Sequence, residues 1–139
     1  MDTVQLKANK KTQLTSVGVA RPIQGLCKVI LYVLDSKSHR VLAQEIFRLR
    51  TNMLEEYNIR VLKEPVLMNP GTVYEIKVVY EGDSTYTYTD TLEEVKDEDD
   101  DDFTLLVKKN FGDLLFHGEQ RVYFCNLITG VGIDVLEKK

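Results

Sequence analysis

The chain has 139 residues and a mass of 16.0 kDa, and its composition is 43% hydrophobic and 29% charged. These values exclude wholesale disorder and collagen-like structure, and the length fits one domain with a hydrophobic core. No apolar stretch approaches the roughly 20 residues of a membrane span. The N-terminal residues lack the apolar core of a signal peptide. We therefore expect a soluble intracellular protein, cytoplasmic or nuclear, without membrane attachment.

The net charge of -4 is concentrated in one segment. Residues Glu93 to Asp102 read EEVKDEDDDD, so eight of the 22 acidic residues and only one of the 18 basic residues lie there. The remainder of the chain holds 14 acidic and 17 basic residues, and is slightly basic. Repulsion among unpaired carboxylates predicts an extended, solvated acidic loop at about residues 93–102.

A hydrophobic period of two dominates the chain and predicts strands. In chain order, the expected strands are Val4–Ala8, Leu14–Val19, Cys27–Leu34, Val41–Leu49, Tyr57–Leu62, Val66–Met68, Val73–Tyr80, Ser84–Thr91, Phe103–Val107, Leu114–Phe116 and Val122–Ile128. Turns are expected at Asp35–His39, Asn69–Gly71 and Glu81–Asp83. Short strands with turns every eight to twelve residues predict an all-β fold, a single antiparallel β-sandwich of jelly-roll type with about ten strands.

Two segments allow more than one interpretation. The apolar run Cys27–Leu34 is nearly continuous, so it predicts either a central strand covered on both faces or a sandwich core strand. The window Val41–Leu54 contains good helix formers with helical spacing, and a helix is the alternative to a strand there. Cys27 and Cys125 both lie in apolar runs, which favours buried, reduced thiols over a disulfide.

The order of several short motifs resembles the PHR domain of giant RING-type ubiquitin ligases and BTB-containing adaptor proteins. The matching segments are Ser16–Ala20, Lys28–Asp35, Val41–Ala43, Phe47–Arg48, Pro65–Tyr74, Val78–Gly82 and Gly118–Gln120. The resemblance covers most of the chain, roughly Val4 to Leu127, and implies that residues 1–139 form a single PHR-like domain. The resemblance implies a jelly-roll-like sandwich that recognises proteins and presents substrates to a ubiquitin ligase.

The sequence offers little for catalysis or metal binding. His39 and His117 are the only histidines, and neither lies in a recognisable nucleophile motif. The carboxylates of the acidic run lack the spacing of a calcium loop. We therefore predict neither an enzyme nor a metal or other cofactor.

Basic residues are present without a clear nucleic-acid signature. Lysines and arginines occur early in the chain, at Lys7, Lys10, Lys11 and Arg21, and could contact phosphates. Basic side chains also protect strand edges, and the acidic run would repel nucleic acid. A nucleic-acid-associated nuclear factor is therefore an alternative that we rank below protein binding.

The segment Ser84–Thr91 alternates hydroxyls and tyrosines. It reads either as an outer strand whose tyrosines cover the core or as a recognition strand. As a recognition strand with the neighbouring acidic run, its predicted partner-binding residues are Tyr86, Tyr88, Asp90, Asp99, Asp100 and Asp101. Together these patterns predict a protein-protein interaction module that recruits substrates or partners to a ubiquitin ligase or another multiprotein complex. A homo-oligomerising scaffold, such as a homodimer, is an alternative because unpaired strand edges can be shared between copies.

Overall fold

The computed structural model describes residues 2–20, 25–50, 57–82, 94–96, 104–109, 112–117, 119–123 and 128–136. All regular secondary structure in these ranges is β-strand. The strands are β1 (Asp2–Ala8), β2 (Thr12–Ala20), β3 (Leu26–Asp35), β4 (Val41–Arg50), β5 (Tyr57–Met68), β6 (Val73–Gly82), β7 (Glu94–Lys96), β8 (Thr104–Lys109), β9 (Gly112–His117), β10 (Glu119–Tyr123) and β11 (Ile128–Val135). The part of the chain described contains no helix long and apolar enough to cross a membrane.

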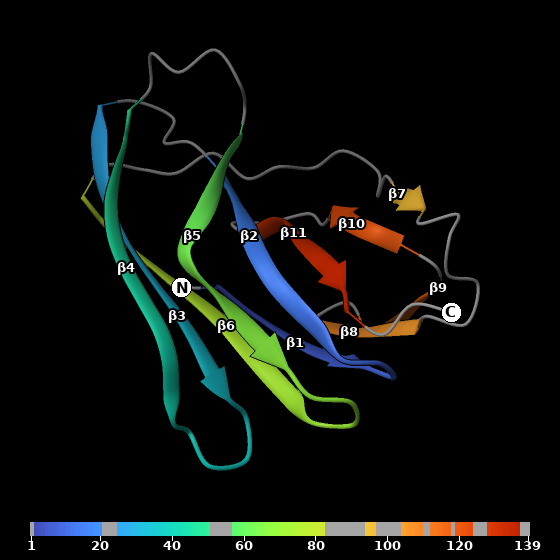
Figure 1. Ribbon diagram of the computed structural model, residues 1–139. Helices are drawn as coiled ribbons and strands as arrows, with labels where there is room; N and C mark the ends of the chain where they lie inside the picture. The colour runs from blue at the N-terminus through green and yellow to red at the C-terminus, as the bar shows by residue number, and fades with distance from the viewer. Residues whose placement is uncertain are drawn as a thin grey trace.

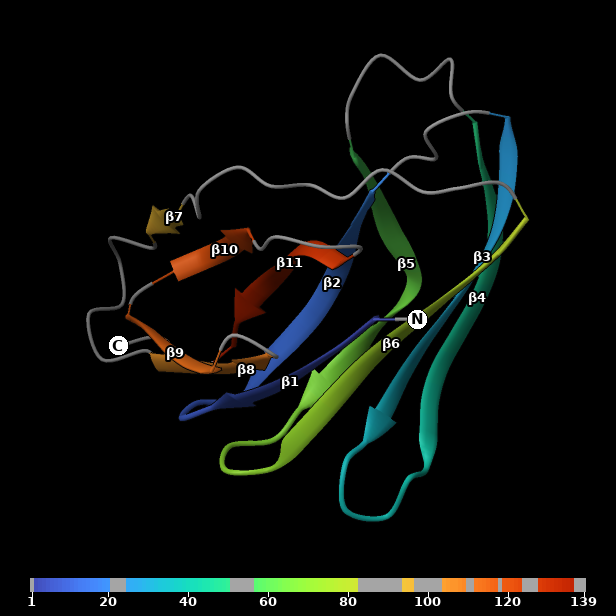
Figure 2. The ribbon, with the colours of Figure 1, turned by 180° about the vertical axis from the view of Figure 1, so that it is seen from behind.

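The strands form two antiparallel sheets that lie one over the other (Figure 1). The first sheet has six strands in the order β4-β3-β6-β1-β8-β9, and the second has five in the order β5-β2-β11-β10-β7. Strands β4 and β5 therefore border their respective sheets, and both views place them on the same side of the molecule (Figures 1 and 2). The prediction of an all-β antiparallel fold is confirmed.

A single hydrophobic core fills the space between the sheets. From the six-stranded sheet, alternate residues such as Val29, Leu31 and Ile76 are at most 1% exposed. From the five-stranded sheet, Leu14 and Ile133 meet them and are at most 2% exposed. This period-two burial arises because successive side chains of a strand point to opposite faces. The result is a sandwich-like packing of two sheets, each with one face in the core.

Segment Val41–Arg50 is a strand, so the helical alternative is wrong for these residues. Strand β4 pairs with β3 from Leu26 opposite Arg50 to Leu34 opposite Val41. The pairing supplies hydrogen bonds along the strand and a place in the core for Leu49, which is 2% exposed. Tertiary pairing has outweighed the local helix propensity of this segment.

Strand β5 joins two segments that the sequence suggested were separate. Lys63, Glu64 and Pro65 interrupt the apolar pattern, yet the strand continues through them. The register against β2 shifts there, because Leu14 pairs with Val66 whereas Ser16 pairs with Val61. The extra residues bulge out of the ladder, which is where a sheet tolerates proline.

The C-terminal part of the described chain contains two strands where one was expected. Val122 belongs to β10 and Ile128 begins β11, so the prediction of a single strand Val122–Ile128 is wrong. Strand β11 is central in the five-stranded sheet, between β2 and β10. Its residue Gly132 faces Ser16 so closely that a Cβ would collide with the serine hydroxyl. Gly132 therefore leaves room for the Ser16 hydroxyl of β2.

Two of the three expected turns are confirmed, whereas Glu81 and Gly82 of the expected turn Glu81–Asp83 belong to β6, and the strand expected at Ser84–Thr91 lies outside the described residues. The Asp35–His39 segment turns β3 into β4, and Asn69–Gly71 turns β5 into β6. In the second turn Gly71 has a φ of 79°, and the Thr72 N–H donates to the Asn69 carbonyl at 3.3 Å. Cys27 is 1% exposed, as predicted, whereas Cys125 lies outside the described residues.

Candidate functional site

An apolar row crosses the outer face of the six-stranded sheet. Ile30 on β3 is paired with Ile46 on β4 and with Val79 on β6. The neighbouring residues Val29 and Val78 point into the core and are fully buried, so Ile30 and Val79 point outward. Ile46 is 55% exposed, and Ile30 and Val79 are half-buried. We call Ile46, Ile30 and Val79 the apolar row.

The apolar surface continues along β3 and β4 toward their connecting turn. Tyr32 and Leu34, the next outward residues of β3, are half-buried, and Leu34 is paired with Val41. Val41 and Leu42 are 49% and 39% exposed. An isolated exposed leucine is ordinary on a protein surface, but adjacent exposed apolar residues are typical of an interaction site.

Charged side chains border the apolar row on the side away from that turn. The Lys28 ammonium lies 3.8 Å from the Glu81 carboxylate, and both side chains are largely exposed. Arg48 is paired with Lys28 across the strands and is exposed. The exposed ion pair between Lys28 and Glu81 adds little stability. These residues therefore form a charged border along one side of the apolar row.

A buried carboxylate fastens β4 to β5. Glu45 is 8% exposed, and its Oε1 accepts a hydrogen bond from Arg60 Nε at 2.8 Å. Its Oε2 accepts one from the Lys63 backbone N–H at 2.9 Å. The Arg60 guanidinium also lies over the Phe47 ring, 4.9 Å from its centroid. These contacts hold the bordering strands of the two sheets together. The negative charge of Glu45 is balanced by the Arg60 guanidinium within the molecule.

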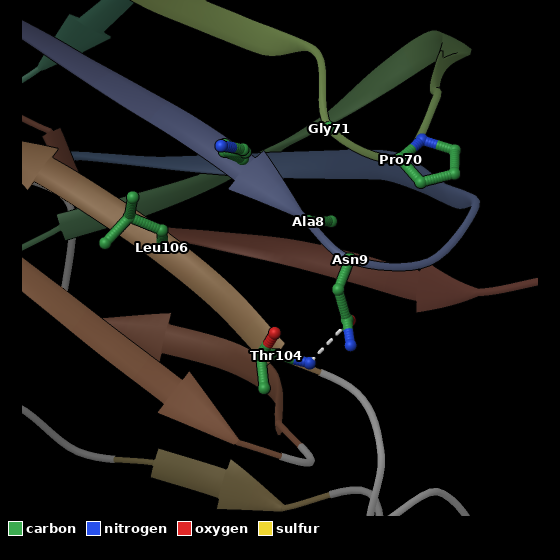
Figure 3. Close-up of a pocket in the computed structure, with 7 residues that line it drawn as sticks. Ala8, Asn9, Pro70, Gly71, Thr104 and Leu106 are labelled. Carbon is green, nitrogen blue, oxygen red and sulfur yellow. Dashed lines mark hydrogen bonds between the residues drawn. The ribbon is translucent and has the colours of Figure 1, made fainter.

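A groove of about 520 Å³ lies at the end of β1 (Figure 3). Its described lining residues are Lys7, Ala8, Asn9, Pro70, Gly71, Thr104 and Leu106. Figure 3 shows Leu106 and Thr104 of β8 on one side and the Pro70-Gly71 turn on the other. Two backbone hydrogen bonds close its floor, from Gly71 N–H to the Ala8 carbonyl at 3.0 Å and from Asn9 N–H to the Thr104 carbonyl at 3.1 Å. The groove is thus formed by segments far apart in the sequence.

The described lining of this groove carries few polar side-chain groups. Lys7 is the only charged group among its described lining residues. The Asn9 Oδ1 already accepts the Thr104 N–H at 2.7 Å, so this oxygen serves the fold. A smaller hollow of about 60 Å³ adjoins it and shares Lys7 and Leu106.

The predicted partner-binding residues all lie outside the described residues. They are Tyr86, Tyr88, Asp90, Asp99, Asp100 and Asp101. Within the acidic run, residues Glu94–Lys96 form the short strand β7, which pairs with β10 at the border of the five-stranded sheet. The acidic run therefore includes three residues with strand pairing, and its other residues are outside the described ranges.

The histidine turn is well defined. His39 is exposed, has a φ of 61°, and donates its N–H to the Asp35 carbonyl at 2.8 Å. The Asp35 carboxylate accepts the backbone N–H groups of Ser38 and Lys37, each at 3.0 Å. These bonds, that from Ser38 first, lower the pKa of Asp35 below its ordinary value of 3.8. The arrangement is a side-chain-capped turn, and His39 takes its predicted place in it.

The described residues contain no group of three or more His, Cys, Asp or Glu side chains arranged to hold a metal ion. Neither a scan against protein-family models nor a search of curated proteins found a match for this sequence.

Sequence reasoning missed the apolar row and the groove. The signal for the row was present in the nearly continuous apolar run Cys27–Leu34, which suggested a strand covered on both faces. In the structure one face of β3 is buried, whereas Ile30, Tyr32 and Leu34 on the other face are only half-buried. The groove had no such signal, because it depends on the placement of β8 beside β1.

Proposed function

We propose that this protein is a non-enzymatic protein-interaction module, a β-sandwich of jelly-roll type that binds a partner on the outer face of its six-stranded sheet. The observation that carries this proposal is the apolar row, with Ile46 55% exposed beside half-buried Ile30 and Val79. Contact of these apolar side chains with water is unfavourable. Their burial against a protein partner would remove that contact and so favour binding. The charged border along one side of the row, formed by Lys28, Glu81 and Arg48, would favour a reversible complex.

The order of motifs that resembles a PHR domain supports a more specific role. In this proposal the module recruits substrates or partners to a ubiquitin ligase or another multiprotein complex, in the cytoplasm or nucleus. Tyr86, Tyr88 and the acidic run would form a second contact, because tyrosines contribute contact area and carboxylates steer a basic partner.

Affinity capture from cell extract tests the proposal with a matched pair of variants. Ile46→Asp puts a charge into the apolar row. The matched control, Val61→Asp, puts the same charge at an exposed position of β5 outside the row, where Val61 is 68% exposed. We expect Ile46→Asp to lose the captured partners by about tenfold or more while Val61→Asp retains them, since a buried charge costs well over 1.4 kcal/mol. Each partner is then purified and its affinity measured directly.

The ligase role has its own test in the same experiment. A third variant replaces residues 93–102 with a Gly/Ser loop and so removes the acidic run that is proposed to form part of the second contact. Equal capture by the intact chain and by Ile46→Asp would contradict the proposed binding face. Recovery of partners without ligase components or their substrates would contradict the ligase role and leave the binding face standing.

A further inference from the structure

Strand β4 is the terminal strand of the six-stranded sheet, next to β3 (Figures 1 and 2). It pairs with β3 on one side, and within the described ranges no strand pairs with its other side. In an antiparallel ladder, alternate residues direct both backbone groups to one neighbour and the residues between them direct theirs away. Every second residue of β4 therefore presents its N–H and C=O to the open edge.

This edge is regular over much of its length. Its register against β3 shows no shift from Leu26 opposite Arg50 to Val33 opposite Ala43, and the one irregularity lies next to Leu42. The segment Ala43–Leu49 contains neither proline nor glycine. Proteins commonly protect an exposed edge with proline, a bulge, an inward-pointing charge or charged side chains along the edge itself. The bulge here protects only the end of β4 near the turn.

The one inward-pointing charge on this stretch is already neutralised. Glu45 gives one carboxylate oxygen to Arg60 and the other to the Lys63 N–H, at 2.8 and 2.9 Å. A strand docking beside it would not have to desolvate a free carboxylate. Glu45 therefore does not provide the usual electrostatic obstacle to edge pairing.

The exposed charges at this edge are basic. Arg48 lies on β4 and Arg40 directly precedes it, both are exposed, and neither forms an ion pair within the described residues. Ile46, two residues before Arg48, shares the outer face with it because side chains alternate along the strand. A partner strand along this edge would therefore lie beside the apolar side chain of Ile46 and, two residues on, beside the cation of Arg48, both on the outer face.

We propose that the edge of β4 over Ala43–Leu49 accepts an extended segment of a partner protein as an additional strand. The segment carries an apolar residue beside Ile46 and an acidic residue two positions away beside Arg48. Backbone hydrogen bonds to β4 supply affinity, and the two side chains supply selectivity. This inference rests on the proposed function and specifies how a partner would engage the apolar row.

A labelled peptide tests the chemistry. The probe is acetylated and amidated Thr-Glu-Val-Val-Val-Glu-Thr, and its matched control replaces both glutamates with lysine. We expect fluorescence anisotropy to show binding of the acidic peptide and at least about tenfold weaker binding of the lysine peptide. Arg48→Glu should reverse this preference, whereas Lys11→Glu, an equal charge change on the β1–β2 turn, should preserve it. Failure of the acidic peptide to bind the intact protein would overturn the inference.

Methylation of the peptide backbone tests strand pairing. Two further probes carry N-methyl groups at alternate amides, one set at even positions and one at odd positions. Because only every second amide of an added strand bonds to β4, we expect one probe to lose about tenfold or more in affinity and the other to bind. Equal binding of both would show that side chains alone hold the peptide, which contradicts edge pairing.

Amide hydrogen exchange locates the contact. The peptide should slow exchange at alternate residues of Ala43–Leu49, and protection confined to other strands would overturn the inference. Protection of these amides without peptide, in a dimer seen by light scattering, would assign the edge to a second copy and would also overturn it. If the edge tests fail while Ile46→Asp still loses its captured partners, the binding face stands without the added strand.

Discussion

Asp35 ends strand β3 and shapes the turn into β4. Its carboxylate accepts two backbone N–H groups, and its own backbone N–H and carbonyl bond to Arg40 and His39. The turn places His39 at a φ of 61°, in the left-handed region, where residues other than glycine are uncommon but asparagine, aspartate and histidine are enriched. The carboxylate thus stabilises the turn through the hydrogen bonds that it accepts from Lys37 and Ser38.

The lowered pKa of Asp35 predicts a pH dependence. A carboxyl group with a folded-state pKa below its unfolded value of 3.8 contributes stability above that value and loses it as the pH falls through the folded-state pKa. Asp35→Asn keeps an oxygen acceptor and removes the charge. We expect the free-energy difference between wild type and Asp35→Asn, from urea unfolding, to be constant near neutral pH and to shrink below 3.8. A difference that is independent of pH would contradict this role.

Among the strands, β4 and β5 are joined by side chains more than by the backbone. They belong to different sheets, and the Glu45–Arg60 pair connects them where the sheets come together. Strand alternation places Glu45 on the same face as Phe47 and Leu49, but sequence patterns could not reveal its partner Arg60. This pairing follows only from the position of β5 beside β4.

The Glu45–Arg60 pair should contribute measurably to stability. We expect Glu45→Ala and Arg60→Ala each to lower the free energy of unfolding by about 1–3 kcal/mol, with the arginine change larger because it leaves a buried carboxylate without its cation. A double-mutant cycle in denaturant should give a coupling of about 1 kcal/mol. The exposed Lys28–Glu81 pair is the control, with an expected coupling below about 0.5 kcal/mol. Equal coupling for the two pairs would show that burial does not matter here.

Several strands followed directly from their sequence pattern. Strand β6 alternates cleanly, and its residues Tyr74, Ile76 and Val78 are buried as their spacing predicted. Strand β11 was missed, and its Gly130 and Gly132 resemble strand breakers, although Gly132 leaves room for the Ser16 hydroxyl of β2. A glycine that ends a strand and one that allows a close approach look the same until the neighbouring strand is known.

Considered as a whole, the molecule holds its two sheets together mainly through the core and, near the end of β2, also through a hydrogen bond. The Tyr80 hydroxyl on β6 donates to the Ala20 carbonyl on β2 at 2.8 Å. Cys27 is paired with Gly82, and Ala20 with Tyr57, so the same end contains the starts of β3 and β5 and the ends of β2 and β6. This bond therefore connects the two sheets where several of their strands begin and end.

Removing the hydroxyl should weaken that connection. We expect Tyr80→Phe to lower the free energy of unfolding by about 0.5–1.5 kcal/mol, the usual worth of one intramolecular hydrogen bond. Tyr32→Phe, on the outer face of the same sheet, should change it by less than about 0.5 kcal/mol. Chemical denaturation of both variants checks this, and a Tyr80→Phe protein as stable as wild type would contradict it.

The sequence by itself determined the all-β class, most strand positions, the turns at Asp35–His39 and Asn69–Gly71, and the concentration of acidic residues in one run. These features are local, because side-chain alternation and turn chemistry depend on residues near each other in the chain. Only the tertiary structure decided the strand order, the Glu45–Arg60 pair, the groove beside Lys7 and the open edge of β4. Each of these depends on which distant strands become neighbours, and the local hydrophobic pattern does not specify that choice.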